Sequence, residues 1–551
     1  MASNTSGGPE TVAEVLASRL HEAGVELVFG LPGGETVELL DALRRRGLRF
    51  ELAHNESSAV FMADATARLT GKPGVCLTTL GPGAANAMAG VAHAYLDRGP
   101  VLIITARTPD HLLPDHTHQV IDLHALYTPV TKGSFKLEPE GADQTIRTAL
   151  ALALGGRPGP VHLELSNETA AQAAGAGSAP GKPRSNDQPE PAPDPTSAPT
   201  SGLAAAADWL TRSQRPVIVA GLGLEPERPY PALRRLAEAA QAPVITTPKG
   251  KGCLPDDHPL AAGTIGLTRT DPAYALLDEA DCIVALGFDV VELVKPWNQP
   301  APLLWLAPWP NQAPTIPARV ELAGPMQPGL EHLAQLSLQP GPDWGENRVM
   351  AYRQALAEPR RPEPSPGRML PQTVLETLRQ ILPRDTLVTT DVGSHKILSS
   401  LTWPSYAPNR FLVSNGLSCM GFALPAAIAG SLALPDQPVV CLVGDGGLAM
   451  VMGELGLLTR LQLPVIVVVF NDAALDLIRS QQIRAAKPVY GTEFSSPDFV
   501  SLARAYQLEA QRVTTGPECA QAIRTAIAAG RPTLIEAMID PSSYPTTPAS
   551  D

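Results

Sequence analysis

The chain has 551 residues, more than one hydrophobic core normally serves, so we expect about three domains. Hydrophobic residues make up 44% of the chain and charged residues 18%, which fits a folded globular protein and excludes a disordered one. The formal net charge of −13, without a basic stripe, argues against a nucleic-acid or anionic-membrane partner.

Targeting signals and cysteine spacing point to the compartment. The N-terminal sequence has neither the charged start nor the apolar run of a signal peptide. No apolar stretch approaches the roughly 20 residues that span a bilayer. The six cysteines are scattered without CxxC spacing, as expected for buried thiols in a reducing compartment. We therefore predict a cytoplasmic enzyme with no membrane partner.

Two polar, Pro-rich stretches divide the sequence. Residues 170–200 are rich in Pro, Ala and Ser and contain almost no large apolar residues, so we predict an extended linker there. A second Pro-rich patch falls within residues 341–370, which we also interpret as a linker. The predicted domains are residues 1–169, 201–340 and 371–551.

Each predicted domain repeats one pattern: a short apolar run, a glycine-rich turn and a helical stretch. The first contains GVCLTTLGPG, the second RPVIVAGLGL and the third VVCLVGDGG. Apolar runs without alternation indicate parallel strands that are covered on both faces. Strands that alternate with helices indicate right-handed crossovers. We therefore predict an α/β protein with three doubly wound parallel sheets.

Two strand ends in the third domain carry acidic residues. One apolar run leads into Gly444-Asp445-Gly446-Gly447, and the next ends at Asn471-Asp472. One strand–helix–strand unit joins them, so both ends should meet at the carboxyl edge of the sheet, where ligands bind. Carboxylates there suit Mg²⁺ or Ca²⁺ with a phosphate completing the shell, and Gly446 and Gly447 leave backbone N–H groups for anionic oxygens. The alternative is a simple turn in which Asp445 caps a helix.

This pair of motifs resembles the signature of thiamine-diphosphate-dependent enzymes. The resemblance implies that Asp445, Asp472 and the carbonyl of Ala474 bind Mg²⁺. TTDVGSH resembles the loop that contacts the diphosphate, and SNGLSCMGFALPAA resembles the segment that supports the bent cofactor on a methionine, here Met420. The implied cofactor-binding residues are Pro32, Gly33, Asn86, Gly393, Ser394, His395, Ser418, Met420, Gly444, Gly446, Gly447, Ala474 and Leu475.

The first domain offers the carboxylate that activates this cofactor. Glu56 precedes Phe61-Met62-Ala63 in a segment that resembles the family motif H-E-x-x-x-x-F-M-A, with Asn55 at the usual histidine position. In the family this carboxylate contacts the aminopyrimidine, and a dry site that raises its pKa favours that role. An isolated glutamate at a helix start would instead be explained by the helix dipole. Family members join Glu56 and Asp445 across a subunit interface, which implies a homodimer or a dimer of dimers.

Within this family the sequence is most similar to acetolactate synthase. GLPGGETVELLDAL, TTLGPGAAN and HQVIDLHALYTPVTK resemble its segments, and Gln119 stands where a glutamine reaches toward substrate. ALGFDVVELVKPWN resembles the catabolic, flavin-independent branch, so we expect no FAD. Leu475 stands where that branch usually has tyrosine, which removes a hydroxyl from the pocket wall and suggests a different substrate.

The resemblance implies a reaction and its catalytic residues, Glu56, Gln119 and Met420. The enzyme would decarboxylate a 2-oxo acid, pyruvate first of all, and join the resulting enamine to a second 2-oxo acid to give 2-acetolactate. The alternatives are another thiamine-diphosphate-dependent 2-oxo acid decarboxylase or carboligase of the aldehyde-lyase type, and a non-catalytic cofactor-binding homologue. The presence of Glu56 counts against the last.

Overall fold

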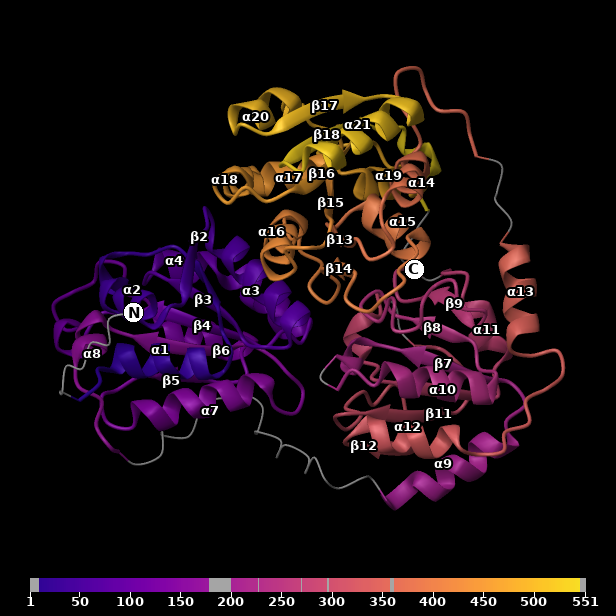
Figure 1. Cartoon of the computed structure of the whole chain (residues 1–551), viewed down its shortest axis with the longest axis horizontal. Coiled ribbons are helices and arrows are strands. Elements are labelled where there is room, and N and C mark those ends of the chain that lie inside the picture. Colours follow the sequence, from indigo (N-terminus) through magenta and orange to yellow (C-terminus); the bar gives the residue numbers. More distant parts are fainter. Residues whose placement is uncertain are drawn as a thin grey trace. The chain divides into compact units, whose positions relative to one another are not determined.

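The computed structural model describes residues 9–177, 200–225, 227–268, 270–294, 297–356 and 361–545. The chain forms two compact units, Met1–Ala192 and Pro193–Asp551, and each is described by itself (Figure 1). Among the described helices, none has both the length and the apolar character needed to cross a membrane.

The first unit is one parallel six-stranded sheet in the order β2-β1-β3-β4-β6-β5. Its strands are β1 (Leu27–Gly30), β2 (Arg49–Leu52), β3 (Gly74–Thr78), β4 (Val101–Ala106), β5 (Ser134–Lys136) and β6 (Val161–Leu165). Its helices are α1 (Val12–Glu22), η1 (Gly34–Thr36), α2 (Val37–Arg46), α3 (Glu56–Thr70), α4 (Pro82–Asn86), α5 (Met88–Leu96), η2 (Asp110–Leu112), α6 (Leu123–Tyr127), η3 (Thr128–Val130), α7 (Ala142–Leu154) and α8 (Asn167–Ala171).

The second unit begins with a central domain, whose parallel sheet has the order β12-β11-β10-β7-β8-β9. The strands are β7 (Pro216–Ala220), β8 (Val244–Thr246), β9 (Ala261–Thr264), β10 (Cys282–Leu286), β11 (Leu303–Ala307) and β12 (Ala318–Ala323). The helices are α9 (Thr200–Arg212), η4 (Leu222–Leu224), α10 (Tyr230–Ala240), α11 (Tyr274–Glu279), η5 (Val290–Glu292), α12 (Met326–Ala334) and α13 (Glu346–Ala355).

A C-terminal domain completes the second unit, with a parallel sheet in the order β14-β13-β15-β16-β18-β17. The strands are β13 (Leu387–Thr390), β14 (Phe411–Val413), β15 (Val439–Gly444), β16 (Val465–Asn471), β17 (Glu509–Val513) and β18 (Thr533–Met538). The helices are α14 (Pro371–Ile381), α15 (Ser394–Thr402), α16 (Ala423–Ala433), α17 (Asp445–Val451), η6 (Met452–Glu454), α18 (Leu455–Arg460), α19 (Asp476–Arg484), α20 (Phe499–Ala505), α21 (Gly516–Ala529) and η7 (Pro541–Ser543).

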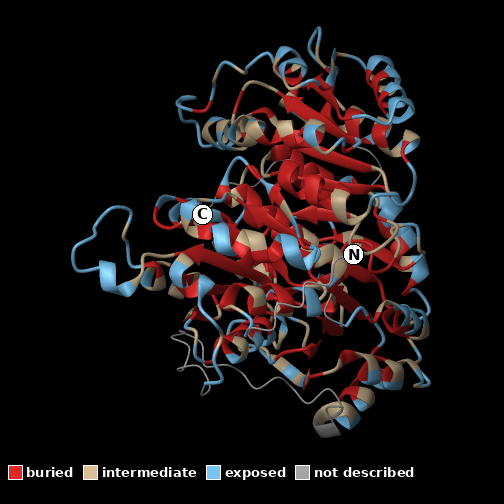
Figure 2. Ribbon diagram, turned by 60° about the vertical axis from the view of Figure 1, so that its left-hand side comes forward, coloured by how far each residue is buried: buried red, intermediate tan, exposed pale blue. Residues whose placement is uncertain are grey.

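The inner strands of each sheet are almost entirely buried, as their apolar runs predict. In the central domain, Ile218 and Val284 belong to one hydrophobic cluster, whereas their strand neighbours Val217 and Ile283 belong to another. Since successive side chains of a strand point to opposite faces, two separate cores flank the sheet. Figure 2 shows most strands as buried and the outer helix surfaces as exposed, whereas the edge strands β2, β12 and β17 are largely exposed or half-buried.

The three sheets have two different topologies. The first and the C-terminal sheets share one strand order when strands are counted from the start of each domain. In the central sheet the strand order switches between the neighbouring strands β7 and β10: the first three strands of the domain lie on one side of this point and the last three on the other. This is the strand order of dinucleotide-binding sheets.

Described elements lie within both predicted linkers. Helix α8 and the backbone pairs Thr11–Ala173 and Glu140–Gly175 attach the start of the predicted first linker to the first domain, next to α1 and α7. Residues 178–199 of that linker lie outside the described residues. The second predicted linker contains α13, whose Val349 and Tyr352 are buried because they pack against the central core.

The single crossover helix expected after Asp445 is also interrupted. It is divided into α17, η6 and α18, because the backbone at Val451 (φ −130°) leaves the helical region.

Candidate active site

A cavity of about 150 Å³ lies at the carboxyl ends of β13, β15 and β16. Among the residues predicted for the cofactor and the metal, it brings together Gly393, Ser394, His395, Met420, Gly444, Asp445, Gly446, Gly447, Asp472, Ala474 and Leu475. This is the edge of a parallel sheet at which ligands are expected.

Asp445 is held in the floor of this cavity by three donors. It is buried, and its carboxylate accepts hydrogen bonds from the backbone of Gly446 and Ala473, each at 2.8 Å, and from the Ser496 hydroxyl at 3.0 Å. Burial raises the pKa of Asp445, while these donors lower it. The N–H of Gly446, expected to be left for a phosphate, donates here to the neighbouring carboxylate.

Asp472 lies in a strongly acidic surrounding. Its pKa is raised to about 8, first by burial and then by the charges of Asp445 and Asp476. Like charges gathered in a buried place are costly unless a cation joins them, so this end of the cavity is suited to a divalent metal ion.

The loop after β16 supplies a backbone oxygen beside the two carboxylates. Leu475 donates to the Thr492 carbonyl and Phe494 to the Ala473 carbonyl, and within the described chain no donor reaches the Ala474 carbonyl between them. The backbone of Ala473 has φ +59°, a conformation that residues other than glycine rarely adopt. Two carboxylates and a free carbonyl are hard oxygen donors that fit Mg²⁺.

The described residues contain no group of three or more His, Cys, Asp and Glu side chains arranged around a metal. The candidate metal site therefore depends on backbone and ligand oxygens in addition to Asp445 and Asp472. A phosphate-bearing cofactor would supply the missing oxygens.

His395 presents a buried polar atom to the same cavity. Its Nε2 atom has no hydrogen-bond partner, and its ring stacks on Phe470 with centroids 5.5 Å apart. A Cβ atom on Gly444 would lie 3.0 Å from the His395 ring. Burial and the charge of Lys396 lower the pKa of His395 to about 3, so the imidazole is neutral. An unpaired donor in a cavity fits an anionic ligand such as a diphosphate.

Gly447 and Asp391 pack against each other behind the part of the cavity that His395 and Gly444 line. A Cβ atom on Gly447 would overlap the Asp391 carboxylate, so only glycine fits. The Asp391 carboxylate accepts from the backbone of Gly421 at 2.9 Å and of Phe422 at 3.0 Å, and thereby holds the segment that follows Met420. Burial raises the pKa of Asp391 to about 6. The sequence prediction missed this residue, although its place at the end of β13 could have indicated it.

The opposite wall is apolar. A Cβ on Gly446 would meet the side chains of Leu475 at 3.1 Å, Met420 at 3.4 Å and Phe494 at 3.5 Å. Ser418, also predicted to bind cofactor, does not line this cavity; it has φ +55° and its hydroxyl donates to the Asn415 carbonyl at 2.9 Å.

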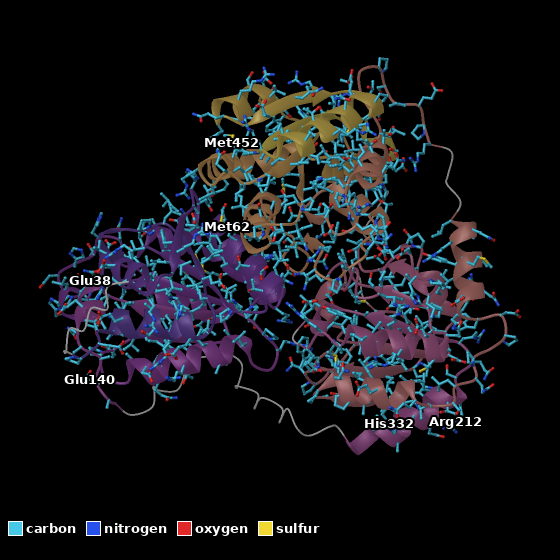
Figure 3. All side chains as sticks on the ribbon, in the orientation of Figure 1. Glu38, Met62, Glu140, Arg212, His332 and Met452 are labelled. Carbon is cyan, nitrogen blue, oxygen red and sulfur yellow. The ribbon has the colours of Figure 1, made fainter. Side chains whose placement is uncertain are left out.

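The first unit holds Glu56 in a separate group. Glu56 is 8% exposed at the first position of α3, and its carboxylate accepts from the Asn86 amide at 3.2 Å. A Cβ on Gly83 would lie 3.2 Å from the other carboxylate oxygen. Asn55 caps α3 by accepting from the backbone of Ser57 and Ser58, which explains how asparagine serves there. Met62, labelled in Figure 3, lies on the same helix.

The remaining predicted residues of the first unit lie around the turn after β3. Gly33 packs on Thr79, and Pro32 is exposed. A Cβ on Gly81 would be 2.5 Å from the Gln119 carbonyl, so the Gly-Pro-Gly turn and Gln119 are in close contact. Gln119 has φ +60° and lines a cavity of about 330 Å³.

Comparisons with known proteins match this architecture. Family models of thiamine pyrophosphate enzymes match three regions: the N-terminal TPP binding domain at residues 10–126, the central domain at 203–333 and the C-terminal TPP binding domain at 391–537. A probable acetolactate synthase large subunit of Methanocaldococcus jannaschii is 32% identical over 96% of this chain and 92% of its own length.

Two further relatives agree. The acetolactate synthase isozyme 3 large subunit of Escherichia coli strain K12 is 32% identical over 90% of this chain and 88% of its own. The acetolactate synthase of Bacillus subtilis strain 168 is 29% identical over 96% and 93%.

The domain matches and the three parallel sheets define a thiamine-pyrophosphate-dependent enzyme with three α/β domains. The chain belongs to the acetolactate-synthase-like family of these enzymes, a group of carboligases. The predicted family, fold class and type of enzyme are thereby confirmed. The branch of the family and the role of each site residue stay predictions.

Proposed function

We propose that this enzyme converts two molecules of pyruvate, or of a closely related 2-oxo acid, into 2-acetolactate and CO₂. The observation that carries the proposal is the cavity at the ends of β13, β15 and β16, where two buried acids, a free carbonyl and an unpaired imidazole face one space. That donor set matches a magnesium diphosphate, and the relatives are named acetolactate synthases.

Each side chain of the cavity has a proposed task. Asp445, Asp472 and the Ala474 carbonyl would hold Mg²⁺, and His395 would donate to a diphosphate oxygen. Met420 would support the cofactor from the apolar wall. When bound, thiamine diphosphate supplies a nucleophilic carbon and an electron sink for the loss of CO₂. Leu475 and Phe494 would keep water from the reacting carbon.

Glu56 would hold a proton against a ring nitrogen of the pyrimidine, and Asn86 would orient its carboxylate. The amide of Asn86 donates to one oxygen of Glu56, which leaves the other oxygen, next to Gly83, for the cofactor. Gln119 would position a substrate. Because Glu56 and Asp445 come from different domains, we propose a homodimer or a dimer of dimers in which the site is shared.

We further propose that the central domain binds no flavin, although its strand order is that of dinucleotide-binding sheets. The Glu292 carboxylate accepts from the Leu222 N–H at 3.0 Å, in the glycine-rich turn where a dinucleotide phosphate would lie. A Cβ on Gly221 would be 2.5 Å from the same carboxylate. The Glu292 carboxyl group already accepts the backbone N–H that a phosphate would use there.

The six free cysteines support the proposed cytoplasmic location. Five are buried, and burial raises the pKa of Cys253 to about 12, so its thiol is unreactive.

One assay tests the proposed function. The purified protein is supplied with thiamine diphosphate, Mg²⁺ and pyruvate, and CO₂ and products are followed together. We expect acetolactate and CO₂ in equal amounts. Acetaldehyde as the sole organic product would indicate a simple decarboxylase, and absence of CO₂ with every 2-oxo acid tried would contradict the proposal. Glu56→Gln should lower turnover by about 10²–10⁴-fold, the range that acid–base groups contribute.

A further inference from the structure

Residues 414–422, here called the methionine segment, connect β14 to α16 and bring Met420 to the wall of the candidate cavity. A Cβ atom on Gly446 would lie 3.4 Å from Cε of Met420. The segment forms neither helix nor strand, and its Ser418 has φ +55°, a backbone conformation that is unfavourable outside glycine. A strained loop of this kind keeps one shape only where its surroundings hold it.

Hydrogen bonds hold the methionine segment together from within. The Ser418 hydroxyl donates to the Asn415 carbonyl at 2.9 Å, and the Cys419 N–H donates to the Ser414 hydroxyl at 2.9 Å. The Asp391 carboxylate holds the end of the segment. Whatever fixes the start of this loop therefore also fixes the backbone next to the methionine.

The start of the methionine segment is tied to the central domain. Asn415 is 4% exposed, and its side-chain nitrogen donates to the backbone carbonyl of Glu292 at 2.9 Å, across 123 residues. Because a carbonyl oxygen can only accept, the amide must present its nitrogen there. This contact joins the loop of one domain to a turn of the other.

The carbonyl that Asn415 contacts belongs to a residue that is held on both sides. Glu292 is fully buried, and its carboxyl group accepts from the Leu222 N–H at 3.0 Å and from the Thr247 hydroxyl. A Cβ atom on Gly266 would lie 2.7 Å from the Glu292 carbonyl oxygen, so neighbouring backbone packs closely against it. The central domain thus offers a rigid acceptor whose position does not depend on the methionine segment.

We propose that Asn415 is a positioning residue, which fixes Met420 for the cofactor by tying the methionine segment to the Glu292 turn of the central domain. This proposal rests on the task of Met420 in the proposed function. Loss of the Asn415 amide would remove the donor from a buried carbonyl and let the loop relax from the strained conformation at Ser418. Met420 would then move, while the metal and diphosphate end of the cavity, built on α15 and α17, would keep its shape.

The test measures binding without turnover. Thiamine diphosphate and inorganic pyrophosphate, each with Mg²⁺, are titrated calorimetrically into the full-length protein and into Asn415→Ala. We expect thiamine diphosphate to bind about tenfold more weakly to the variant, the effect of one lost buried hydrogen bond. Pyrophosphate should bind unchanged, because it needs the metal and diphosphate end of the cavity but not Met420. The matched control, Asn347→Ala, removes an exposed amide that donates to the Pro342 carbonyl and should change neither affinity.

A double-mutant cycle tests whether Asn415 acts through Met420. Met420→Ala should weaken the binding of thiamine diphosphate but not of pyrophosphate, and Asn415→Ala should add little to this loss in the double variant. Unchanged binding of thiamine diphosphate to Asn415→Ala, an equal loss of both ligands, or additive losses in the double variant would each refute the role of Asn415. Pyruvate takes no part in these titrations, so a parent protein that binds the cofactor but forms no acetolactate refutes only the proposed function.

Hydrogen exchange of the full-length protein before cofactor is added gives a second readout. The backbone N–H groups of the methionine segment should exchange faster in Asn415→Ala than in the parent, while those of α15 and α17 keep their rates. Unchanged exchange in the methionine segment would refute the positioning role. Faster exchange throughout the C-terminal domain would refute it as well, since the amide would then support the whole domain.

Discussion

The central and C-terminal domains of the second unit both end buried parallel strands in glycine-rich turns, and they use these turns differently. In the central domain, Gly221 and Gly223 make room for Glu292 and for the backbone of Gly287. The Glu292 carboxylate accepts from Leu222 and from the Thr247 hydroxyl, so side chains of the domain itself fill the turn. In the C-terminal domain, Gly444 and Gly446 border a cavity whose His395 has an unpaired nitrogen.

This difference separates a structural acid from a ligand-binding one. Both Glu292 and Asp472 have a pKa raised to about 8, with burial as the main cause. At Glu292, donors from Thr247 and Leu222 lower the pKa and outweigh the nearby acid Asp289. At Asp472, the largest influences after burial are the acids Asp445 and Asp476, which raise the pKa further. A raised pKa alone therefore does not identify a functional site; the sign of the neighbouring charges and an open cavity do.

The largest expected effect on activity comes from removing the charge of Asp445 in the cavity of the C-terminal domain. Asp445→Asn keeps the shape of the side chain but removes half of the carboxylate pair, so Mg²⁺ and the diphosphate should no longer be held. We expect turnover to fall by more than the 10–100-fold typical of a group that only supports a metal ligand. The thermal stabilisation by cofactor and Mg²⁺ should also disappear.

Asp436→Asn, at an exposed position before β15, is the matched control and should change neither quantity. If Asp445→Asn kept the parent's cofactor affinity, the glycine-rich turn at Gly444 would be as structural as the turn at Gly221. The difference in use between the C-terminal and central domains would then be refuted.

A second prediction concerns the space that glycine leaves. Gly447→Ala would push a methyl group into the Asp391 carboxylate and displace the backbone that follows Met420. Overpacking of this kind costs about 1–3 kcal/mol of unfolding free energy. Gly329→Ala in α12 meets only the Leu306 side chain at 3.4 Å and should be neutral or stabilise by up to about 1 kcal/mol. Thermal unfolding of both variants, with and without cofactor, measures the difference, and equal melting temperatures would contradict it.

Strand ends were the part of the site that the sequence made predictable. Asp445 and Asp472 end neighbouring runs of apolar residues, and one crossover unit had to bring those ends to the same edge of the sheet. The glycines around them predicted a close approach of a ligand or of the backbone. Three separate sheets followed from the same alternation of strands and helices.

Contacts between distant segments could not be predicted in this way. Glu292 reaches a turn 70 residues earlier in the chain, and only the folding back of η5 brings it there. Asp391 supports Gly421 and Phe422 through hydrogen bonds across 30 and 31 residues. No local pattern specifies such partners. The contact between Lys396 on α15 and the Ser418 hydroxyl likewise joins positions 22 residues apart.

The buried Glu292 in the glycine-rich turn of the central domain predicts that the stability of the protein depends on pH. The pKa of Glu292 is raised from 4.5 to about 8, so between these values the folded protein binds more protons there than the unfolded chain. Stability from this group is complete below about pH 4.5 and falls as the pH rises to about 8. Glu292→Gln removes the titration, and its stability should therefore rise relative to the parent over this range, by up to a few kcal/mol.

Thermal unfolding of both proteins at matched pH values measures this difference. If the stabilities of the two proteins changed with pH in parallel, Glu292 would not change its protonation on unfolding. The raised pKa that Glu292 shares with Asp472 would then be refuted for Glu292.

The smallest expected effect is that of Thr247→Val, which tests the hydrogen-bond donors around Glu292. The Thr247 hydroxyl donates to the carboxylate and lowers its pKa, although burial dominates. Thr247→Val keeps the volume of the side chain but removes this donor, so the charged form of Glu292 becomes less favourable and its pKa should rise further. We expect a loss of about 1 kcal/mol at pH values above the pKa and little change under acidic conditions, where the protonated carboxyl needs no such donor. In the double variant with Glu292→Gln this pH dependence should vanish, because no charge remains for the hydroxyl to stabilise; a loss independent of pH in both backgrounds would assign Thr247 to packing alone.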